Sequence, residues 1–146
     1  MTSSHPVAAG ESASISDGEA LLAAARAAVR SAYVPYSGFP VGAAVLSGGQ
    51  VFSGCNIESA SYGLTICAER VAIFAAVATG RRMIEALALT CPCAAELQVG
   101  SRMPCGACRQ VMAEFAAPGF RVLVDGVGIF SLEELLPAPF LLPVPR

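Results

Sequence analysis

Cys67-Ala68-Glu69-Arg70, followed later by Pro104-Cys105-Gly106-Ala107-Cys108-Arg109-Gln110, is the pair of stretches around which the rest of the chain is organised. Thiolates are preferred zinc ligands, and a catalytic zinc site keeps three protein ligands and one open position. The carboxyl group of Glu69 lies close enough in sequence to reach whatever the metal binds, as general acid/base catalysis requires. The predicted ligands are Cys67, Cys105 and Cys108.

Both stretches are expected to begin helices. The apolar, alanine-rich run 66–78 predicts a helix that ends at Gly80, and the run 105–117 predicts a second helix that ends at Pro118-Gly119. Two helix N-termini that face one metal favour thiolates through their exposed N–H groups and dipoles.

One arginine lies close to a predicted ligand in each half of the site: Arg70 is three residues after Cys67, and Arg109 directly follows Cys108. Three thiolates around one dication leave a net charge of about −1, which makes the metal a weak electrophile. We expect Arg70 or Arg109 to donate hydrogen bonds to the sulfurs and restore electrophilic character. A surface ion pair is the alternative for either side chain.

Four short sequence motifs, in this order and with these gaps, carry a resemblance to a known family. The resemblance covers the chain from about Ala20 to Phe140. The motifs are Phe39-Pro40-Val41-Gly42-Ala43-Ala44, Asn56-Ile57-Glu58, Ser61-Tyr62-Gly63-Leu64-Thr65-Ile66-Cys67-Ala68-Glu69-Arg70 and the stretch from Pro104 to Gln110. The chain resembles the small, homotetrameric cytidine deaminases, in which a glutamate that is not a ligand acts beside a three-ligand zinc.

The resemblance implies an activity, a cofactor and an assembly. The activity is zinc-dependent hydrolytic deamination of cytidine and 2′-deoxycytidine to uridine and 2′-deoxyuridine, with release of ammonia, in pyrimidine salvage. The implied cofactor is one Zn²⁺ per subunit, with Glu69 as the catalytic residue. The implied partners are a small nucleoside and three further copies of the chain.

The resemblance also implies substrate contacts. Phe39 is expected against the pyrimidine, and Asn56 and Glu58 on the ribose, chiefly on its 3′-OH; without the family they read as a core phenylalanine and turn residues. We expect the backbone of Ala68 to face the base. Tyr62 is implied near a neighbouring subunit's active site, with a surface tyrosine as the alternative.

The C-terminus fits the family less well. Leu135-Leu136-Pro137-Ala138-Pro139-Phe140 matches a segment whose aromatic residue reaches an active site, but the tail 141–146 departs from the usual ending. For Phe140, substrate contact and packing as a lid or at an interface both remain open.

Three readings compete with cytidine deamination. A non-catalytic, structural zinc site would close with a fourth ligand from Cys55, Cys91 or Cys93, although such a site needs no glutamate two residues after its first cysteine. A related family that deaminates blasticidin-type antibiotics shares the Cys-Ala-Glu and Cys-x-x-Cys-Arg-Gln words. An RNA- or DNA-editing deaminase is the third.

The composition excludes several classes. The chain has 146 residues, nine arginines, no lysine and a formal net charge of −2, so no basic stripe indicates a polynucleotide partner. It is 55% hydrophobic with a mean hydropathy of +0.62, yet no apolar run is long enough for a membrane helix. We attribute the excess of apolar residues to subunit interfaces.

The terminal segments and the cysteines indicate how the chain is divided into domains and in which cellular compartment we expect it. Residues 1–16 predict a disordered arm without the features of a secretory signal, and 17–146 predict one deaminase domain. We therefore expect a cytoplasmic protein whose six cysteines are ligands or reduced thiols. His5, the one histidine, is expected to be a solvent-exposed bystander in the arm.

The predicted fold is α/β, a three-layer α/β/α sandwich with a central mixed sheet, as in the cytidine deaminases. A parallel crossover is expected across 83–124. The predicted elements, in order, are a helix from a capping box at Ser16 to Ala32, a hairpin of 41–46 and 50–55, the first ligand helix, a strand at 83–91, the second ligand helix, a strand at 120–124, and a short helix from a second capping box at Ser131 to Pro137.

Overall fold

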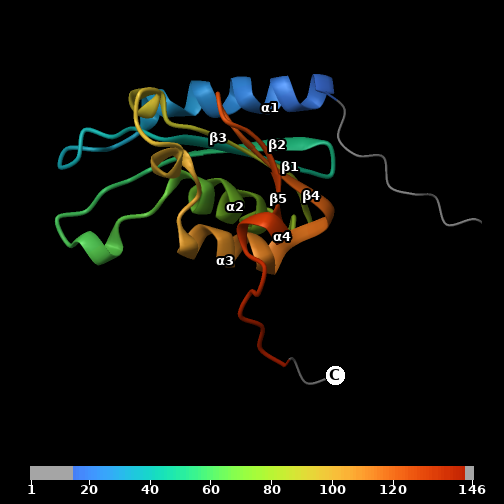
Figure 1. Ribbon diagram of the computed structural model, residues 1–146. Coiled ribbons are helices and arrows are strands. Elements are labelled where there is room, and N and C mark those ends of the chain that lie inside the picture. Colours follow the sequence, from blue (N-terminus) through green and yellow to red (C-terminus); the bar gives the residue numbers. More distant parts are fainter. Residues whose placement is uncertain (1–14, 144–146) are drawn as a thin grey trace, which may run out of the picture.

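The computed structural model describes residues 15–143, which form four α-helices and five strands (Figure 1). The predicted arm, with His5, lies outside these residues except for its last two positions, which begin the first helix. The elements are α1 (Ile15–Ala28), β1 (Gly42–Ser47), β2 (Gln50–Cys55), α2 (Ala68–Ala78), β3 (Ile84–Thr90), α3 (Gly106–Phe115), β4 (Ala116–Val124), β5 (Gly128–Ser131) and α4 (Leu132–Leu135), with short 3₁₀ segments at 29–31, 62–64, 92–94 and 99–102.

The five strands form one mixed sheet in the order β2-β1-β3-β4-β5. β3 and β4 are parallel and every other neighbouring pair is antiparallel. Two parallel strands need a crossover, and α3 lies between them in the chain. The expected mixed sheet and the parallel connection across 83–124 are therefore confirmed.

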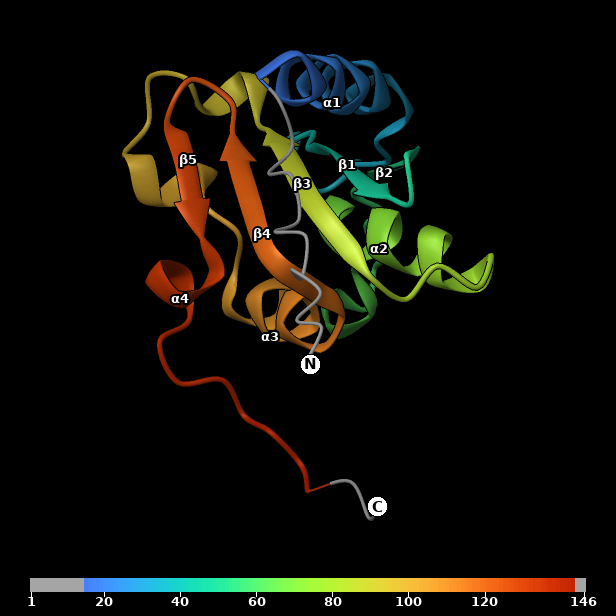
Figure 2. The ribbon, with the colours of Figure 1, turned by 90° about the vertical axis from the view of Figure 1, so that its right-hand side faces the viewer.

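Helices cover both faces of the sheet, as Figure 2 shows, with α1 on one side and α2 and α3 on the other. Side chains of β3 alternate accordingly: Ala86 and Ala88 pack with α1, whereas Leu87 and Leu89 belong to the larger core beneath α2 and α3. Because both faces are buried there, residues 86–89 of this strand form a continuous apolar run. The α/β/α layering is confirmed.

Element boundaries differ from the predictions at three places. The first helix begins at Ile15, so Ser16 is not its N-cap. The helix of the second zinc segment ends at Phe115, and β4 already includes Pro118-Gly119, where a register shift in the β3–β4 pairing tolerates both residues. β5 was not expected, because four residues are too few for a periodic signal.

The second capping box is confirmed. Ser131 is the N-cap of α4, its hydroxyl accepts from the Glu134 N–H, and the Glu134 carboxylate accepts from the Ser131 N–H. α4 thereby begins directly at the end of β5, beside the start of the C-terminal segment.

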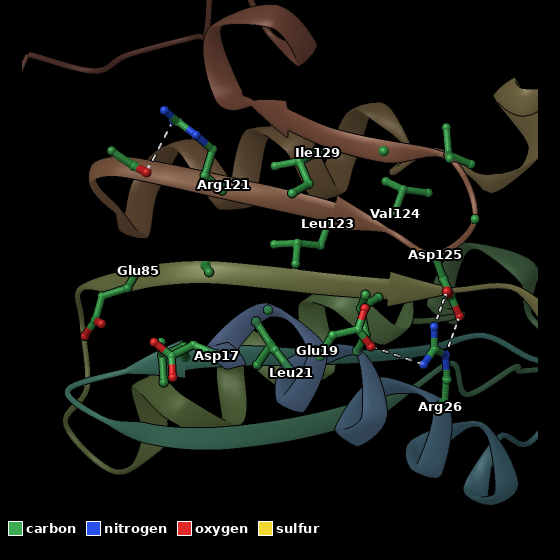
Figure 3. A pocket seen from close by; sticks show the side chains of 18 residues that line it. Asp17, Glu19, Leu21, Arg26, Glu85, Arg121, Leu123, Val124, Asp125 and Ile129 are labelled. Carbon is green, nitrogen blue, oxygen red and sulfur yellow. Dashed lines mark hydrogen bonds and ion pairs between the residues drawn. The ribbon is translucent and has the colours of Figure 1, made fainter. Parts of the chain in front are cut away.

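A groove of about 800 Å³ lies beside α1, on the face of the sheet that this helix leaves open over β4 and β5 (Figure 3). Its apolar floor includes Leu21 of α1 and Leu123 of β4. At one end Arg26 binds both carboxylate oxygens of Asp125, with distances of 2.6 and 2.8 Å.

No helix within residues 15–143 combines the length and the apolar character that a membrane crossing requires.

Candidate functional site

The sulfur atoms of Cys67, Cys105 and Cys108 lie within 4.8 Å of one another, and no other such group of metal-binding side chains occurs in residues 15–143. Cys67 and Cys105 have sulfurs 3.9 Å apart, and Cys105 and Cys108 have sulfurs 3.5 Å apart. Tetrahedral zinc with bonds of about 2.3 Å needs sulfurs about 3.8 Å apart. The donor set and its spacing therefore fit Zn²⁺.

Two helix starts bring these sulfurs together. Cys67 is the N-cap of α2 and Cys105 the N-cap of α3, and neither side chain caps its helix by a hydrogen bond. Cys108 lies in the first turn of α3 and is buried. The thiols therefore face the N-terminal, electropositive ends of two helices, as the sequence predicts.

The charges within the cluster favour a thiolate at Cys67. The thiol of Cys108 donates to Cys67, which lowers the pKa of Cys67 and raises the pKa of Cys108. A guanidinium nitrogen of Arg70 lies 3.4 Å from the Cys67 sulfur and lowers the pKa of Cys67 further. Arg70 thus has the contact with a ligand that we expected of it.

Arg109 contacts backbone instead of sulfur. Its guanidinium donates to the carbonyl of Pro104, at 2.8 Å, and to the carbonyl of Leu135 at the end of α4, at 2.7 Å. Arg109 therefore fixes the residue that precedes Cys105 and connects it to α4. Arg109 therefore acts on the cluster only by holding backbone groups. Arg70 is the arginine that contacts a ligand.

Glu69 lies in the first turn of α2, two residues after Cys67, and only 4% of it is exposed. Burial raises the pKa of Glu69 to about 7, and the negative charge of Cys67 adds to the increase. A buried carboxyl group with a pKa near neutrality is suited to accept and return a proton.

A pocket of about 380 Å³ opens onto this cluster and lies at the carboxyl end of β3, where ligands bind in many α/β proteins. It contains seven residues selected from the sequence: Phe39, Asn56, Glu58, Cys67, Ala68, Glu69 and Cys105. It also contains Cys91, which the sequence offered only as the fourth ligand of a structural zinc site, and six residues that the sequence did not indicate: Ser37, Val41, Thr65, Leu89, Ser101 and Met103.

Asn56 and Glu58 hold the segment that carries Phe39. The side-chain amide of Asn56 donates to the Phe39 carbonyl at 2.8 Å and accepts from the Val41 N–H at 2.9 Å. The Glu58 carboxylate accepts three hydrogen bonds from Tyr36 and Ser37, and chiefly the Ser37 hydroxyl lowers the pKa of Glu58.

Tyr62 and Phe140 do not line this pocket. Tyr62 is 76% exposed, and its ring meets that of Tyr36 edge to face with centroids 6.2 Å apart. Phe140 is 68% exposed, while its backbone N–H and carbonyl both bond to the side-chain amide of Gln110 on α3.

The remaining cysteines lie outside the metal cluster, so the described residues supply no fourth sulfur to close the site. Cys91 nevertheless lines the pocket, where burial raises its pKa to about 12 and keeps it a neutral thiol. Its position at the end of a buried strand is the signal that would have placed it there. The groove in Figure 3 has the larger volume, but none of these cysteines lines it, and the candidate chemistry lies in the smaller pocket.

Comparison with known proteins agrees with this site. Residues 15–123 match the family model for the cytidine and deoxycytidylate deaminase zinc-binding region. The chain is 45% identical over 129 residues to a cytidine deaminase from Sporosarcina psychrophila, which covers 85% of this chain and 91% of that protein. It is 33% identical over 107 residues to a blasticidin-S deaminase from Bacillus cereus, which covers 68% of this chain and 76% of that protein.

A solved structure agrees as well. The crystal structure of a cytidine deaminase from Burkholderia pseudomallei superposes with a TM-score of 0.73 at 46% identity, over 84% of this chain and 98% of that one. The family model covers both zinc segments, from Cys67 to Cys108. With its three-cysteine cluster, its buried glutamate and its mixed sheet, this chain belongs to the cytidine and deoxycytidylate deaminase family.

Proposed function

We propose that this protein hydrolyses cytidine and 2′-deoxycytidine to uridine and 2′-deoxyuridine, with release of ammonia, in pyrimidine salvage. The observation that carries the proposal is a pocket lined by the buried Glu69 and by two cysteines, Cys67 and Cys105, of a cluster of three cysteine sulfurs. The higher identity to a cytidine deaminase than to a blasticidin-S deaminase favours the nucleoside substrate.

Cys67, Cys105 and Cys108 would hold the zinc ion, one per subunit. When bound, zinc lowers the pKa of a coordinated water to about 7, so that hydroxide is available at neutral pH. Glu69 takes a proton from the water that adds to C4 of the pyrimidine and delivers it to N3. It then takes the remaining proton from the hydroxyl now on C4 and gives it to the exocyclic nitrogen, which leaves as ammonia while the C4 carbonyl forms.

Other pocket residues bind and orient the nucleoside. Phe39 packs against the pyrimidine, and the backbone of Ala68 faces its polar edge. Asn56 and Glu58 bind the ribose, chiefly its 3′-OH. All four residues line the same pocket as Glu69, which supports these roles.

Arg70 tunes the cluster. Its guanidinium lies against the Cys67 sulfur, so it withdraws electron density from one ligand and offsets the net negative charge of three thiolates. A zinc ion held there would thereby keep its ability to polarise a coordinated water.

We propose a homotetramer in which Tyr62 and Phe140 contact a neighbouring subunit's active site. Both side chains are more than two thirds exposed, although they are large and apolar. A reducing compartment such as the cytoplasm suits the chain, because all six cysteines are free thiols in the structure and three must remain thiolates.

The decisive experiment compares wild type and Glu69→Gln, both zinc-replete, by the loss of cytidine absorbance in the ultraviolet. Glutamine keeps the volume and removes the proton acceptor, so we expect an unchanged zinc content and kcat lower by about 10²- to 10⁴-fold. Glu114→Gln, an exposed site on α3, is the matched control and should match wild type.

A near wild-type rate for Glu69→Gln would refute the role of Glu69. If neither protein consumes cytidine, a blasticidin-type substrate is tested next, because a blasticidin-S deaminase is among the relatives. If both substrates remain unchanged, a structural zinc site becomes the better explanation, and X-ray absorption should then show four sulfurs instead of three and one lighter atom.

A further inference from the structure

Ser37, a residue of the pocket wall, stands between the two parts of the site that are assigned to the sugar and the base. Its hydroxyl donates to Oε1 of Glu58 and accepts from the backbone N–H of Phe39 at 3.0 Å. One side-chain oxygen therefore connects Glu58 directly to the segment that presents the Phe39 ring.

The hydrogen bonds on Glu58 leave little of its carboxylate for a ligand. Oε2 accepts the N–H groups of Tyr36 at 2.9 Å and of Ser37 at 3.2 Å, and Oε1 accepts the Ser37 hydroxyl. An ionised carboxylate offers about four acceptor positions. The protein occupies three of them, so one position on Oε1 remains for a donor from the substrate.

Ser37 must act through its neighbours. A serine hydroxyl carries a single proton, and this one is given to Glu58, so the side chain has no donor left for the substrate. The Phe39 backbone is held on both sides, by Ser37 at its N–H and by the Asn56 amide at its carbonyl. A change at Ser37 therefore alters Glu58 and Phe39 together.

We propose that Ser37 is a positioning residue that directs the free acceptor of Glu58 toward the 3′-OH of the sugar and couples that contact to the placement of Phe39. The inference rests on the proposed function, because it assumes a nucleoside in this pocket. Its consequence is that recognition of the sugar hydroxyl depends on a side chain that does not touch the hydroxyl.

The test is the ratio of kcat/KM for cytidine to kcat/KM for 3′-deoxycytidine, in wild type, Ser37→Ala and Ser37→Thr. A hydrogen bond to a charged acceptor supports a wild-type ratio of about ten or more. Ser37→Ala should reduce the ratio to about one to three, mainly by raising KM for cytidine, whereas Ser37→Thr keeps the hydroxyl and should keep the ratio. Ser53→Ala, at an exposed serine of β2, is the control and should match wild type.

A second measurement makes the test independent of turnover and of folding. Binding of uridine and 3′-deoxyuridine is measured by calorimetry in the Glu69→Gln background, with circular dichroism and zinc content as checks. The same loss of preference is expected when Ser37→Ala is added. A purely structural role would weaken both ligands equally and leave the ratio unchanged.

The outcomes separate the two claims. If wild type does not deaminate cytidine, the proposed function fails. If wild type is active but Ser37→Ala retains the full preference for cytidine, the inference about Ser37 is wrong. If active wild type shows no preference for the 3′-OH, both the assignment of Glu58 to the sugar and the inference are overturned.

Discussion

Asp125 illustrates, at the scale of single residues, how the far side of the sheet supports the pocket. Its carboxylate accepts from the Arg26 guanidinium and from the Thr90 hydroxyl at 2.8 Å. Its backbone N–H donates to the carbonyl of Leu89. Since Leu89 lines the catalytic pocket on the opposite face of β3, this network fixes the ends of β3 and β4 against α1.

The same network predicts a pH-dependent contribution to stability. The hydrogen bond from Arg26 lowers the pKa of Asp125, so its stabilisation is complete at neutral pH and is lost as pH falls from about 5 through the folded-state pKa. Asp125→Asn should cost about 1–2 kcal/mol at pH 7, a modest value because Arg26 is half exposed. Urea unfolding should show this difference shrinking as the pH falls below about 4.

Glu133→Gln, at an exposed position of α4, provides the comparison and should change stability little at either pH. A constant difference between wild type and Asp125→Asn from pH 7 to pH 3 would show that the Asp125 charge contributes nothing.

Some site residues can be predicted from sequence and others cannot, for a physical reason. The cysteines and Glu69 belong to short motifs whose spacing already encodes the chemistry. Ser37 reads only as a turn residue, because its role arises from a hydrogen bond to Glu58, 21 positions away. Cys91 enters the pocket because β3 ends there, which depends on strand order.

At the scale of elements, two glycines let helices approach the sheet closely. A Cβ atom on Gly42 of β1 would lie 2.1 Å from the Ala25 carbonyl oxygen of α1. A Cβ atom on Gly54 of β2 would lie 2.4 Å from the Ala72 nitrogen of α2. Since both neighbours are backbone atoms, no side-chain rotation relieves either contact.

Gly54→Ala should therefore displace α2, the helix whose first turn carries Glu69. We expect a loss of about 1–3 kcal/mol in the free energy of unfolding, as for overpacked cores, together with weaker zinc retention. Urea unfolding and the zinc content after dialysis against a chelator measure the two effects. Gly100→Ala meets no atom within 4 Å and is the control; equal values for both variants would contradict this account.

The type of an element was predictable where the spacing of apolar residues or the helix-capping residues indicate it clearly. Examples are the β3–α3–β4 crossover and the capping box of α4. The failures lie at junctions. α3 passes directly into β4 without a loop. The helix-breaking residues Pro118-Gly119 therefore placed the predicted helix end too late, and no local signal marked the true end at Phe115. β5 forms because it pairs with β4. This tertiary contact cannot be predicted from the sequence of four residues.

At the scale of the whole molecule, many large apolar side chains of the described residues are exposed. They include Tyr33, Ile57, Tyr62, Leu64, Phe74 and Phe140. Large apolar side chains that gather on an exposed surface are typical of sites that bind another protein or subunit. In the proposed homotetramer these side chains are candidates for the subunit interfaces, and one of them, Tyr62, meets Tyr36 of its own chain.

Mixing of variants tests the proposed assembly. Wild type should have a mass of about 60 kDa by light scattering, four chains of 14.9 kDa. If Tyr62 acts on a neighbour's site, co-expressed Tyr62→Ala and Glu69→Gln subunits should form tetramers that are more active than either variant alone. In such a mixed tetramer, a site with an intact Glu69 can receive an intact Tyr62 from a neighbouring subunit.

Co-expression of Glu69→Gln with Glu114→Gln supplies the reference, because that mixture should follow simple dilution of active subunits. A mixture of the Tyr62 and Glu69 variants that only averages their separate activities would place Tyr62 outside any neighbouring site. A wild-type mass of one chain would exclude the tetramer itself.

Two of the three zinc ligands occupy helix N-caps without capping them. Serine, threonine or aspartate at such a position accepts a backbone N–H and stabilises the helix by about 0.5–2 kcal/mol. Metal binding and helix capping therefore favour different side chains at the same positions. Drift of Cys67 to serine exchanges a ligand for a better cap. Loss of this metal ligand therefore need not bring loss of the fold, because the substitution that removes the ligand also strengthens the start of α2.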